Sequence, residues 1–104
     1  MSAYIQREYH YTGKIKSEYF VCDGKKEGEF KQYWSNGKLC IICNYVDNKI
    51  HSEYKRYHFN GRLYIICNYV DGKGNGEYKK YWDNGQLYSI CNYIDDKKKW
   101  KIMC

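Results

Sequence analysis

The strongest constraint on the fold of this chain is an internal repeat with a period of 24 residues. The three full units share the same residue at 12 of their 24 positions, and they span residues 28–51, 52–75 and 76–99. Residues 4–27 fit as a degenerate fourth unit, and residues 100–104 begin a fifth that would supply a closing strand. Periods of this length are typical of arrays in which each unit packs only against its neighbours. The sequence therefore predicts a single repeat domain over residues 1–104.

Each unit has the pattern of a β-hairpin. An Asn-Gly pair separates two strand-like runs, and this pair is the strongest short signal for a two-residue hairpin turn, in which both central residues take positive φ. A second turn begins with Asp, which tolerates left-handed geometry. Aromatic residues make up 19% of the chain and Pro is absent, which also favours strands. We predict an all-β fold, an elongated single-layer antiparallel meander of stacked hairpins. The Asn-Gly pairs are Asn36-Gly37, Asn60-Gly61 and Asn84-Gly85, and the Asp turns start at Asp23, Asp47, Asp71 and Asp95.

The repeat also resembles a known family. The resemblance rests on the run GEYKKYWDNGQL at residues 76–87, continued by NYID at residues 92–95. These elements are similar to the variant form of the MORN repeat found in proteins of bacteria and large DNA viruses, which are often labelled antitoxin-like. The resemblance covers nearly the whole chain. It implies a single-layer sheet of stacked hairpins and a role in interaction rather than catalysis.

The second strand of each unit carries apolar residues on both of its faces. Strict alternation places Leu39, Ile41, Cys43 and Tyr45 on one face, and Cys40, Ile42, Asn44 and Val46 on the other. A sheet with one solvated face normally carries apolar residues on the buried face only. We therefore expect one face to pack within the array and the other to contact a protein partner or a second copy of the chain, most simply in a two-fold homodimer.

The residues expected to contact a partner recur at equivalent positions of the repeat. Tyr and Trp are favoured interface anchors, although recurring aromatics in a repeat array more often form its core, and both interpretations stay open. The candidate partner-binding residues are Trp34, His58, Trp82, Tyr64, Tyr88, Ile42, Ile66 and Ile90.

The charge pattern raises a second candidate function. Lys and Arg number 18 against 12 Asp and Glu, for a net charge of +6. Clustered lysines near the end of the chain suggest peripheral binding to anionic membrane lipid as the alternative. Nucleic acid is a weaker prediction, because arginine is scarce and Glu recurs in every full unit. The lipid candidates are Lys97, Lys98, Lys99 and Lys101.

The six cysteines indicate a reducing compartment. The chain has no secretory signal pattern, no glycosylation sequon and no apolar run long enough to span a bilayer. We therefore expect free thiols and a cytoplasmic location, in the host cytoplasm if the protein is viral. The abundance of Lys, Asn, Ile and Tyr is typical of an AT-rich bacterial or viral genome. Cys43, Cys67 and Cys91 are one repeated position, which we expect to be small, apolar and buried, whereas Cys22 and Cys104 are expected to be the more exposed thiols.

The sequence contains no recognisable catalytic or cofactor-binding constellation. Cys40 and Cys43 form a Cys-x-x-Cys without a second ligand pair, and their odd offset on a strand sends them to opposite faces. The glycine-rich stretch 72–76 lacks the helix that would hold a phosphate. We expect no enzyme activity, no metal and no cofactor. The chain is thus predicted to be a non-enzymatic repeat module that acts as a protein-interaction or assembly surface.

Overall fold

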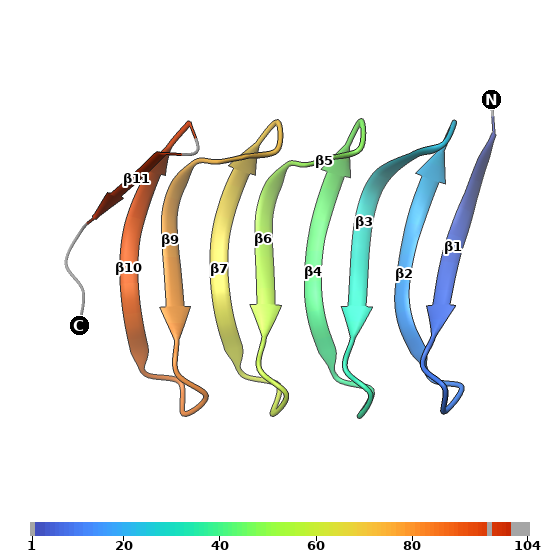
Figure 1. Ribbon diagram of the computed structural model, residues 1–104, viewed down its shortest axis with the longest axis horizontal. Helices are drawn as coiled ribbons and strands as arrows, with labels where there is room; N and C mark the ends of the chain where they lie inside the picture. Colours follow the sequence, from blue (N-terminus) through green and yellow to red (C-terminus); the bar gives the residue numbers. More distant parts are fainter. Residues whose placement is uncertain (1, 96, 101–104) are drawn as a thin grey trace.

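The computed structural model describes residues 2–95 and 97–100, and these form one open antiparallel sheet (Figure 1). The sheet measures 45 × 32 × 14 Å, so it is one layer thick. Strands follow one another across it in chain order, which confirms the predicted all-β meander. The strands are β1 (Ala3–Tyr9), β2 (Ile15–Cys22), β3 (Lys25–Tyr33), β4 (Leu39–Val46), β5 (Lys49–Ile50), β6 (Ser52–Tyr57), β7 (Leu63–Val70), β8 (Lys73–Gly74), β9 (Gly76–Tyr81), β10 (Leu87–Ile94) and β11 (Lys97–Trp100).

The four hairpins of the sheet follow the sequence repeat. Strands β3, β6 and β9 are the first strands of the full units, and β4, β7 and β10 are the second strands. The pair β1–β2 repeats this arrangement within the degenerate unit 4–27. Strand β11 pairs with β10 and ends at Trp100. The predicted closing strand 100–104 therefore overlaps β11 at one residue, and its remainder lies outside the described residues.

The Asn-Gly turns differ in type from the prediction. Only the glycine takes positive φ: Gly37 has a φ of 88°, whereas Asn36 is outside the positive region. The Gly37 N–H donates to Trp34 O at 2.9 Å, and the Trp34 N–H donates to Lys38 O at 2.8 Å. This is a three-residue loop, a type I turn followed by a left-handed glycine. Asn36 stabilises the turn through its side chain, because its Oδ1 accepts a hydrogen bond from the Lys38 N–H at 2.9 Å.

The Asp turns are the two-residue hairpin turns. Asp47 and Asn48 both take positive φ, 52° and 71°, and the flanking Val46 and Lys49 are paired. These are the features of a type I′ turn, whose twist matches that of the strands it joins. The prediction thus identified both turns of the repeat but assigned the doubly left-handed geometry to the wrong one.

A β-bulge recurs near the start of each second strand. In β4, Ile41 pairs with Gln32 and Leu39 pairs with Tyr33, which leaves Cys40 as an extra residue. The same register shift falls at Tyr64 in β7 and Tyr88 in β10. Because of the bulge, the strict alternation predicted for this strand does not hold. Leu39 shares a face with Ile42, and the bulged residue lies on the face of Ile41. Cys40 and Cys43 consequently lie on the same face, and not on opposite faces as predicted.

The two faces of the sheet differ in chemistry. On the tyrosine face, half-buried rings cover buried small residues, and these rings include Tyr45, Tyr54, Tyr69, Tyr78 and Tyr93. Its cysteines Cys43, Cys67 and Cys91 are 2%, 3% and 2% exposed, which confirms the predicted burial of that position. The opposite face, here called the isoleucine face, carries Ile42, Ile66 and Ile90 among Glu and Lys side chains.

Candidate interaction surface

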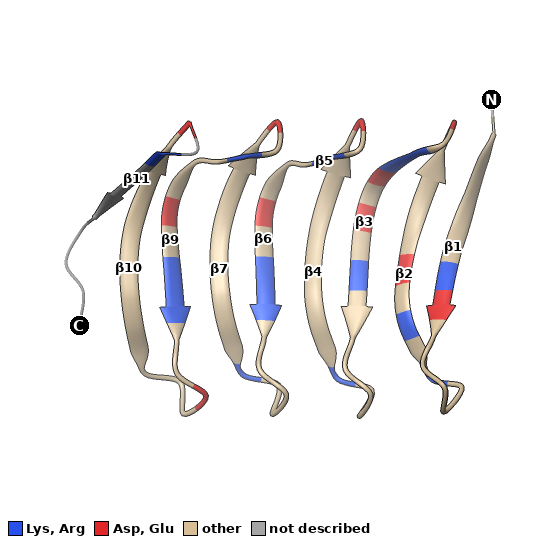
Figure 2. Cartoon of the chain, in the orientation of Figure 1, with Lys and Arg blue, Asp and Glu red and all other residues tan. Residues whose placement is uncertain are grey.

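The isoleucine face is built from alternating charged and uncharged strands. Within the full units, the described Lys, Arg, Asp and Glu residues lie on the first strands, the turns and the short strands β5, β8 and β11, whereas β4, β7 and β10 carry none (Figure 2). Ile66 pairs with Lys55 on one side and with Lys79 on the other. Each isoleucine of the inner units therefore lies between two lysine stems, which cover its sides while their ammonium groups remain in water.

Ion pairs fix the charged rows on this face. Each first strand carries Glu and Lys two residues apart, so both side chains project from the same side of the sheet. The pairs are Lys31–Glu29 at 3.4 Å, Lys55–Glu53 at 3.3 Å and Lys79–Glu77 at 3.2 Å. The hydrogen bond that the ammonium group donates to the neighbouring glutamate raises the pKa of Lys31 and likewise that of Lys79. Such exposed pairs contribute little stability, so their main effect is to order the surface.

A second apolar row lies on the same face, nearer the Asp turns. Val46, Val70 and Ile94 occupy equivalent positions at the ends of β4, β7 and β10, and they are 52%, 49% and 56% exposed. The candidate set from the sequence did not include them, although alternation along the strand places Val46 on the face of Ile42. The isoleucine face thus carries two parallel rows of apolar side chains.

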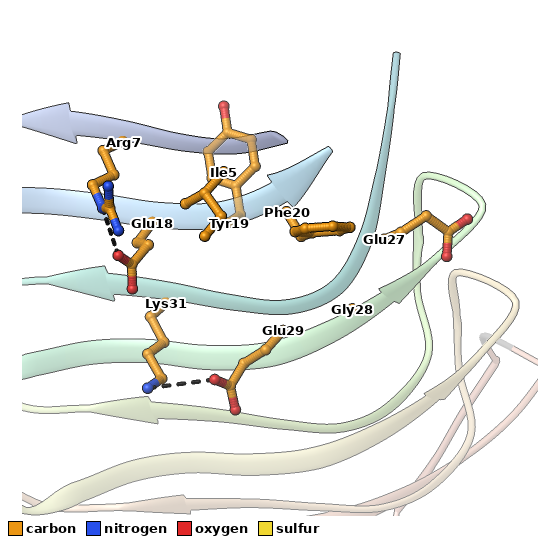
Figure 3. A pocket seen from close by; sticks show the side chains of 9 residues that line it. All are labelled: Ile5, Arg7, Glu18, Tyr19, Phe20, Glu27, Gly28, Glu29 and Lys31. Atoms are coloured by element: carbon orange, nitrogen blue, oxygen red, sulfur yellow. Dashed lines mark hydrogen bonds and ion pairs between the residues drawn. The ribbon is translucent and has the colours of Figure 1, made fainter. Parts of the chain in front are cut away.

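The isoleucine face ends in a groove over β1, β2 and β3 (Figure 3). Its volume is about 490 Å³, and Ile5 and Phe20 contribute apolar side chains that are 51% and 42% exposed. Charged side chains line it as well: Arg7 Nε donates to Glu18 Oε2 at 2.7 Å, a bond that raises the pKa of Arg7, and the Lys31–Glu29 pair lies on the next strand. The groove has the size of an ordinary ligand pocket.

The predicted aromatic candidates join neighbouring units to each other. The Trp34 Nε1–H donates to Tyr57 O at 3.2 Å, and His58 Nε2 lies 2.8 Å from Tyr81 O. A carbonyl oxygen only accepts, so His58 carries its proton on Nε2. His10 makes the same contact to Tyr33 O at 3.0 Å. These bonds favour the alternative reading of the row as part of the internal packing.

The eight candidate residues do not form one surface. Tyr64 stacks on His58 and Tyr88 on Trp82, each with ring centroids 4.3 Å apart. The bulge moves both tyrosines away from the isoleucine face, where strict alternation had placed them. Of the candidates, Ile42, Ile66 and Ile90 lie on the isoleucine face, and Trp34, His58, Trp82, Tyr64 and Tyr88 lie together at the Asn-Gly ends of the hairpins.

Among the lysines proposed for lipid contact, Lys97, Lys98 and Lys99 belong to β11, and Lys97 is exposed. Lys101 lies outside the described residues.

At the Asp turns, each lysine pairs with the aspartate of the next unit. These pairs are Lys25–Asp47 at 2.8 Å, Lys49–Asp71 at 3.7 Å and Lys73–Asp95 at 3.6 Å. The positive charge along that end of the sheet is therefore largely balanced.

The described cysteines are all free thiols. Desolvation raises the pKa of Cys43 and of Cys67 from the ordinary 9.0 to about 11, so both thiols are protonated at neutral pH. Cys22 is half-buried, and Cys104 lies outside the described residues. Within residues 2–95 and 97–100, no three His, Cys, Asp or Glu side chains are grouped as metal ligands. No helix long and apolar enough to cross a membrane occurs in this part of the chain.

The fold and its repeated contacts define a single-layer β-repeat protein. The chain matches the MORN repeat variant family four times in succession, at residues 5–23, 26–47, 50–71 and 74–95. Because these matches cover most of the sequence, the protein belongs to that family, as the resemblance implied. The four matches agree in number and spacing with the four predicted units, with starting points shifted by one or two residues. Neither the curated proteins nor the solved structures contain a match to this chain.

Proposed function

We propose that this protein is a non-catalytic interaction module whose isoleucine face binds a partner protein. One observation carries the proposal: two rows of partly exposed apolar side chains run between ordered ion pairs toward a groove of about 490 Å³. An apolar strip bordered by polar side chains is typical of a protein-binding surface. Membership of a repeat family supports the modular role.

The spacing of the isoleucine row favours a helical segment in the partner. Ile42, Ile66 and Ile90 recur on every second strand, so they are about 10 Å apart across the sheet. Seven residues of an α-helix advance about 10.5 Å. A helix laid across the strands would therefore present an apolar residue to each isoleucine in turn. The net charge of +6 favours acidic residues beside that apolar stripe.

Lipid binding is less favoured because the turn lysines are already paired with aspartates. Lys25 Nζ, for example, lies 2.8 Å from Asp47 Oδ1. A juxtamembrane basic surface depends on uncompensated charge, each basic residue contributing about 1 kcal/mol near an anionic surface. Binding to anionic lipid therefore stands as an outcome of the test below.

The test compares partner capture by three forms of the chain. The wild type, the triple variant Ile42→Ser/Ile66→Ser/Ile90→Ser and the control Tyr4→Ser are immobilised and exposed to extract of the native cell. Tyr4 is 50% exposed on the other face, at the edge strand β1. We expect a retained protein whose recovery falls at least about tenfold with the triple variant and stays constant with the control. Crosslinking should then place an amphipathic helix of the partner against β4 to β10.

Two outcomes would contradict the proposal. The first is a partner that all three forms retain equally. The second is the absence of a retained protein together with salt-sensitive binding of all three forms to phosphatidylserine vesicles, which would favour the lipid alternative. Circular dichroism of the triple variant checks that loss of capture does not result from unfolding.

A further inference from the structure

Equivalent residues follow the Asp turns, and they differ in size. Lys26 pairs with Val21, Ile50 with Tyr45, and Gly74 with Tyr69. The 24-residue spacing makes them one position of the repeat, which holds a lysine, an isoleucine, a glycine and, at Lys98 opposite Tyr93, a lysine again. Two of the rings around the first position recur around the third: Phe30 and Tyr45 correspond to Tyr78 and Tyr93, whereas Tyr19 corresponds to Cys67.

At the first of these positions, the chain places a cation in an aromatic cage. Lys26 Nζ lies 5.1 Å from the ring centroid of Tyr19, 5.3 Å from that of Phe30 and 5.1 Å from that of Tyr45. All three distances are within the range of a cation–π interaction, about 6 Å. This cage therefore shows, within the same protein, that three aromatic rings can hold an ammonium group.

At the third position, a comparable cage is present without a side chain to fill it. Tyr78 and Tyr93 have ring centroids 5.5 Å apart, against 5.6 Å for the equivalent Phe30 and Tyr45. Tyr69 supplies a third ring from the position that Val21 occupies opposite Lys26, and Gly74 is itself buried. The resulting cavity has a volume of about 210 Å³ and is lined by Cys67, Tyr69, Gly74, Gly76, Tyr78 and Tyr93, together with Asn68.

The lining of this cavity is uncharged and rich in aromatic faces. Desolvation raises the pKa of Tyr78 to about 12 and that of Cys67 to about 11, so both groups are protonated at neutral pH. The cavity is smaller than the pockets that hold drug-sized ligands, about 300–1,000 Å³, and it suits a compact head group. Recognition of quaternary ammonium groups is the established use of aromatic cages in proteins.

We propose that the cage formed by Tyr69, Tyr78 and Tyr93 over Gly74 binds an alkylammonium group, much as the cage of Tyr19, Phe30 and Tyr45 holds the ammonium of Lys26. The group is either the head of a small quaternary amine or the methylated lysine side chain of a protein, since both present the same chemistry. The site lies on the tyrosine face, so it is separate from the isoleucine face and independent of the partner proposed above.

One charge opposes such a ligand. Lys80 Nζ lies 5.9 Å from the ring centroid of Tyr78, so it shares that ring with any cation in the cage. Removing the Lys80 charge should therefore strengthen binding, which gives the test a variant with a predicted gain.

The probe is choline, and its control is 3,3-dimethylbutan-1-ol, which has the same shape without the charge. Titration of the full chain is followed by amide NMR. We expect choline to shift the Gly74 and Gly76 resonances, the neutral analogue to bind at least about threefold more weakly, and Lys80→Gln to bind choline more tightly. Equal binding of the two probes, or no shift at Gly74 and Gly76 in millimolar choline, would overturn the proposal.

Two reciprocal variants use the repeat as its own control. Gly74→Lys should fill the cage as Lys26 fills its own and abolish the choline shifts, and the existing lysine and isoleucine at this position show that the fold accepts a side chain there. Lys26→Gly should open a second choline site beside Phe30 and Tyr45. Retention of the Gly74 and Gly76 shifts in a folded Gly74→Lys variant would overturn the proposal.

A final comparison distinguishes the two sources of the ligand. A short peptide carrying trimethyllysine is titrated beside the same peptide with unmodified lysine. Binding of the modified peptide more tightly than choline assigns the cage to a protein ligand, and equal or weaker binding assigns it to a small amine. A preference for the unmodified peptide over both would contradict recognition of a methylated ammonium group.

Discussion

At the residue scale, the most informative position is Ser52. It takes a φ of 74°, whereas Gly28 and Gly76 occupy the same position of the neighbouring units with φ of 82° and 89°. A Cβ added at either glycine would meet no atom within 4 Å. The cost at Ser52 is therefore the left-handed backbone itself, about 1–2 kcal/mol for a residue with a Cβ, and not a lack of space.

We predict that Ser52→Gly increases the free energy of unfolding by about 1 kcal/mol, because relief of the left-handed strain outweighs the added flexibility of the unfolded chain. Urea denaturation followed by circular dichroism measures the change. The matched control is Gly76→Ser, which should destabilise the chain by a similar amount. An unchanged or lower midpoint for Ser52→Gly would show that the serine side chain stabilises the bend.

The buried thiols make stability depend on alkaline pH. Burial raises the pKa of Cys43 and Cys67 from 9.0 to about 11. Above pH 9 the unfolded chain releases these protons while the folded chain keeps them, so the stability present below pH 9 is lost as the pH rises toward 11. Tyr78, whose pKa rises from 10.0 to about 12, acts in the same direction at the upper end.

The prediction is a falling urea midpoint between pH 9 and 11, with a shallower fall in the double variant Cys43→Ala/Cys67→Ala. Because both alanines also change packing, the slopes against pH are compared, not the absolute midpoints. Identical slopes for the wild type and the variant would show that the two thiols titrate alike in the folded and unfolded chains.

At the scale of the element, the Asn-Gly turns connect units as well as strands. Asn60 Oδ1 accepts from the Arg62 N–H at 2.9 Å within its own turn, and Asn60 Nδ2 donates to Asp83 O of the next unit at 2.8 Å. Asn84 makes the same bond within its turn, from the Gln86 N–H at 2.9 Å, and its Nδ2 donates to Gln86 Oε1 at 3.4 Å.

This difference predicts unequal effects of one substitution. Asn60→Ala should cost about 1 kcal/mol more than Asn84→Ala, because it also removes a bond between units. Urea denaturation of the two variants measures the difference. Equal losses would mean that the bond from Asn60 to Asp83 contributes no net stability.

The element scale also shows how far the sequence could predict the structure. The period, the hairpins and both turn positions followed from the residues, because Asn-Gly and Asp-led pairs restrict the backbone wherever they occur. The bulge did not, since its positions hold Lys16, Cys40, Tyr64 and Tyr88, which share no backbone preference. The face of Tyr64 and Tyr88 was therefore predicted wrongly. Likewise, the cage at Gly74 depends on rings from three strands, which no local pattern brings together.

At the scale of the whole molecule, a sheet one layer thick leaves both faces open to solvent. Val46, Val70 and Ile94 are each about half exposed on the isoleucine face, and Tyr4 is 50% exposed on the other. Contiguous exposed apolar patches above a few hundred Å² are uncommon in soluble monomers. Self-association would cover part of this area, most simply through a two-fold axis, which uses the same surface on both copies.

We predict a dimer in solution, with twice the 12.6 kDa mass of the chain, by light scattering after size exclusion at micromolar concentration. Val46→Asp/Val70→Asp should shift the population to monomer, whereas Tyr4→Ser should not. A monomer of the wild type would contradict self-association through the row of Val46 and Val70. A dimer that persists in the double Asp variant would place the contact elsewhere, for instance along a strand edge.

The side-chain hydrogen bonds and ion pairs between the described units reach forward by nearly one period. Lys25 meets Asp47 22 residues later, and Asn36 meets the carbonyl of Phe59 23 residues later. Through these bonds, each unit contacts its immediate successor. Each added unit would extend the array by about 10 Å and add one more isoleucine at the same interval. In such a chain, the number of repeats therefore sets both the number of binding positions and the length of the array, while the geometry of each binding position stays the same.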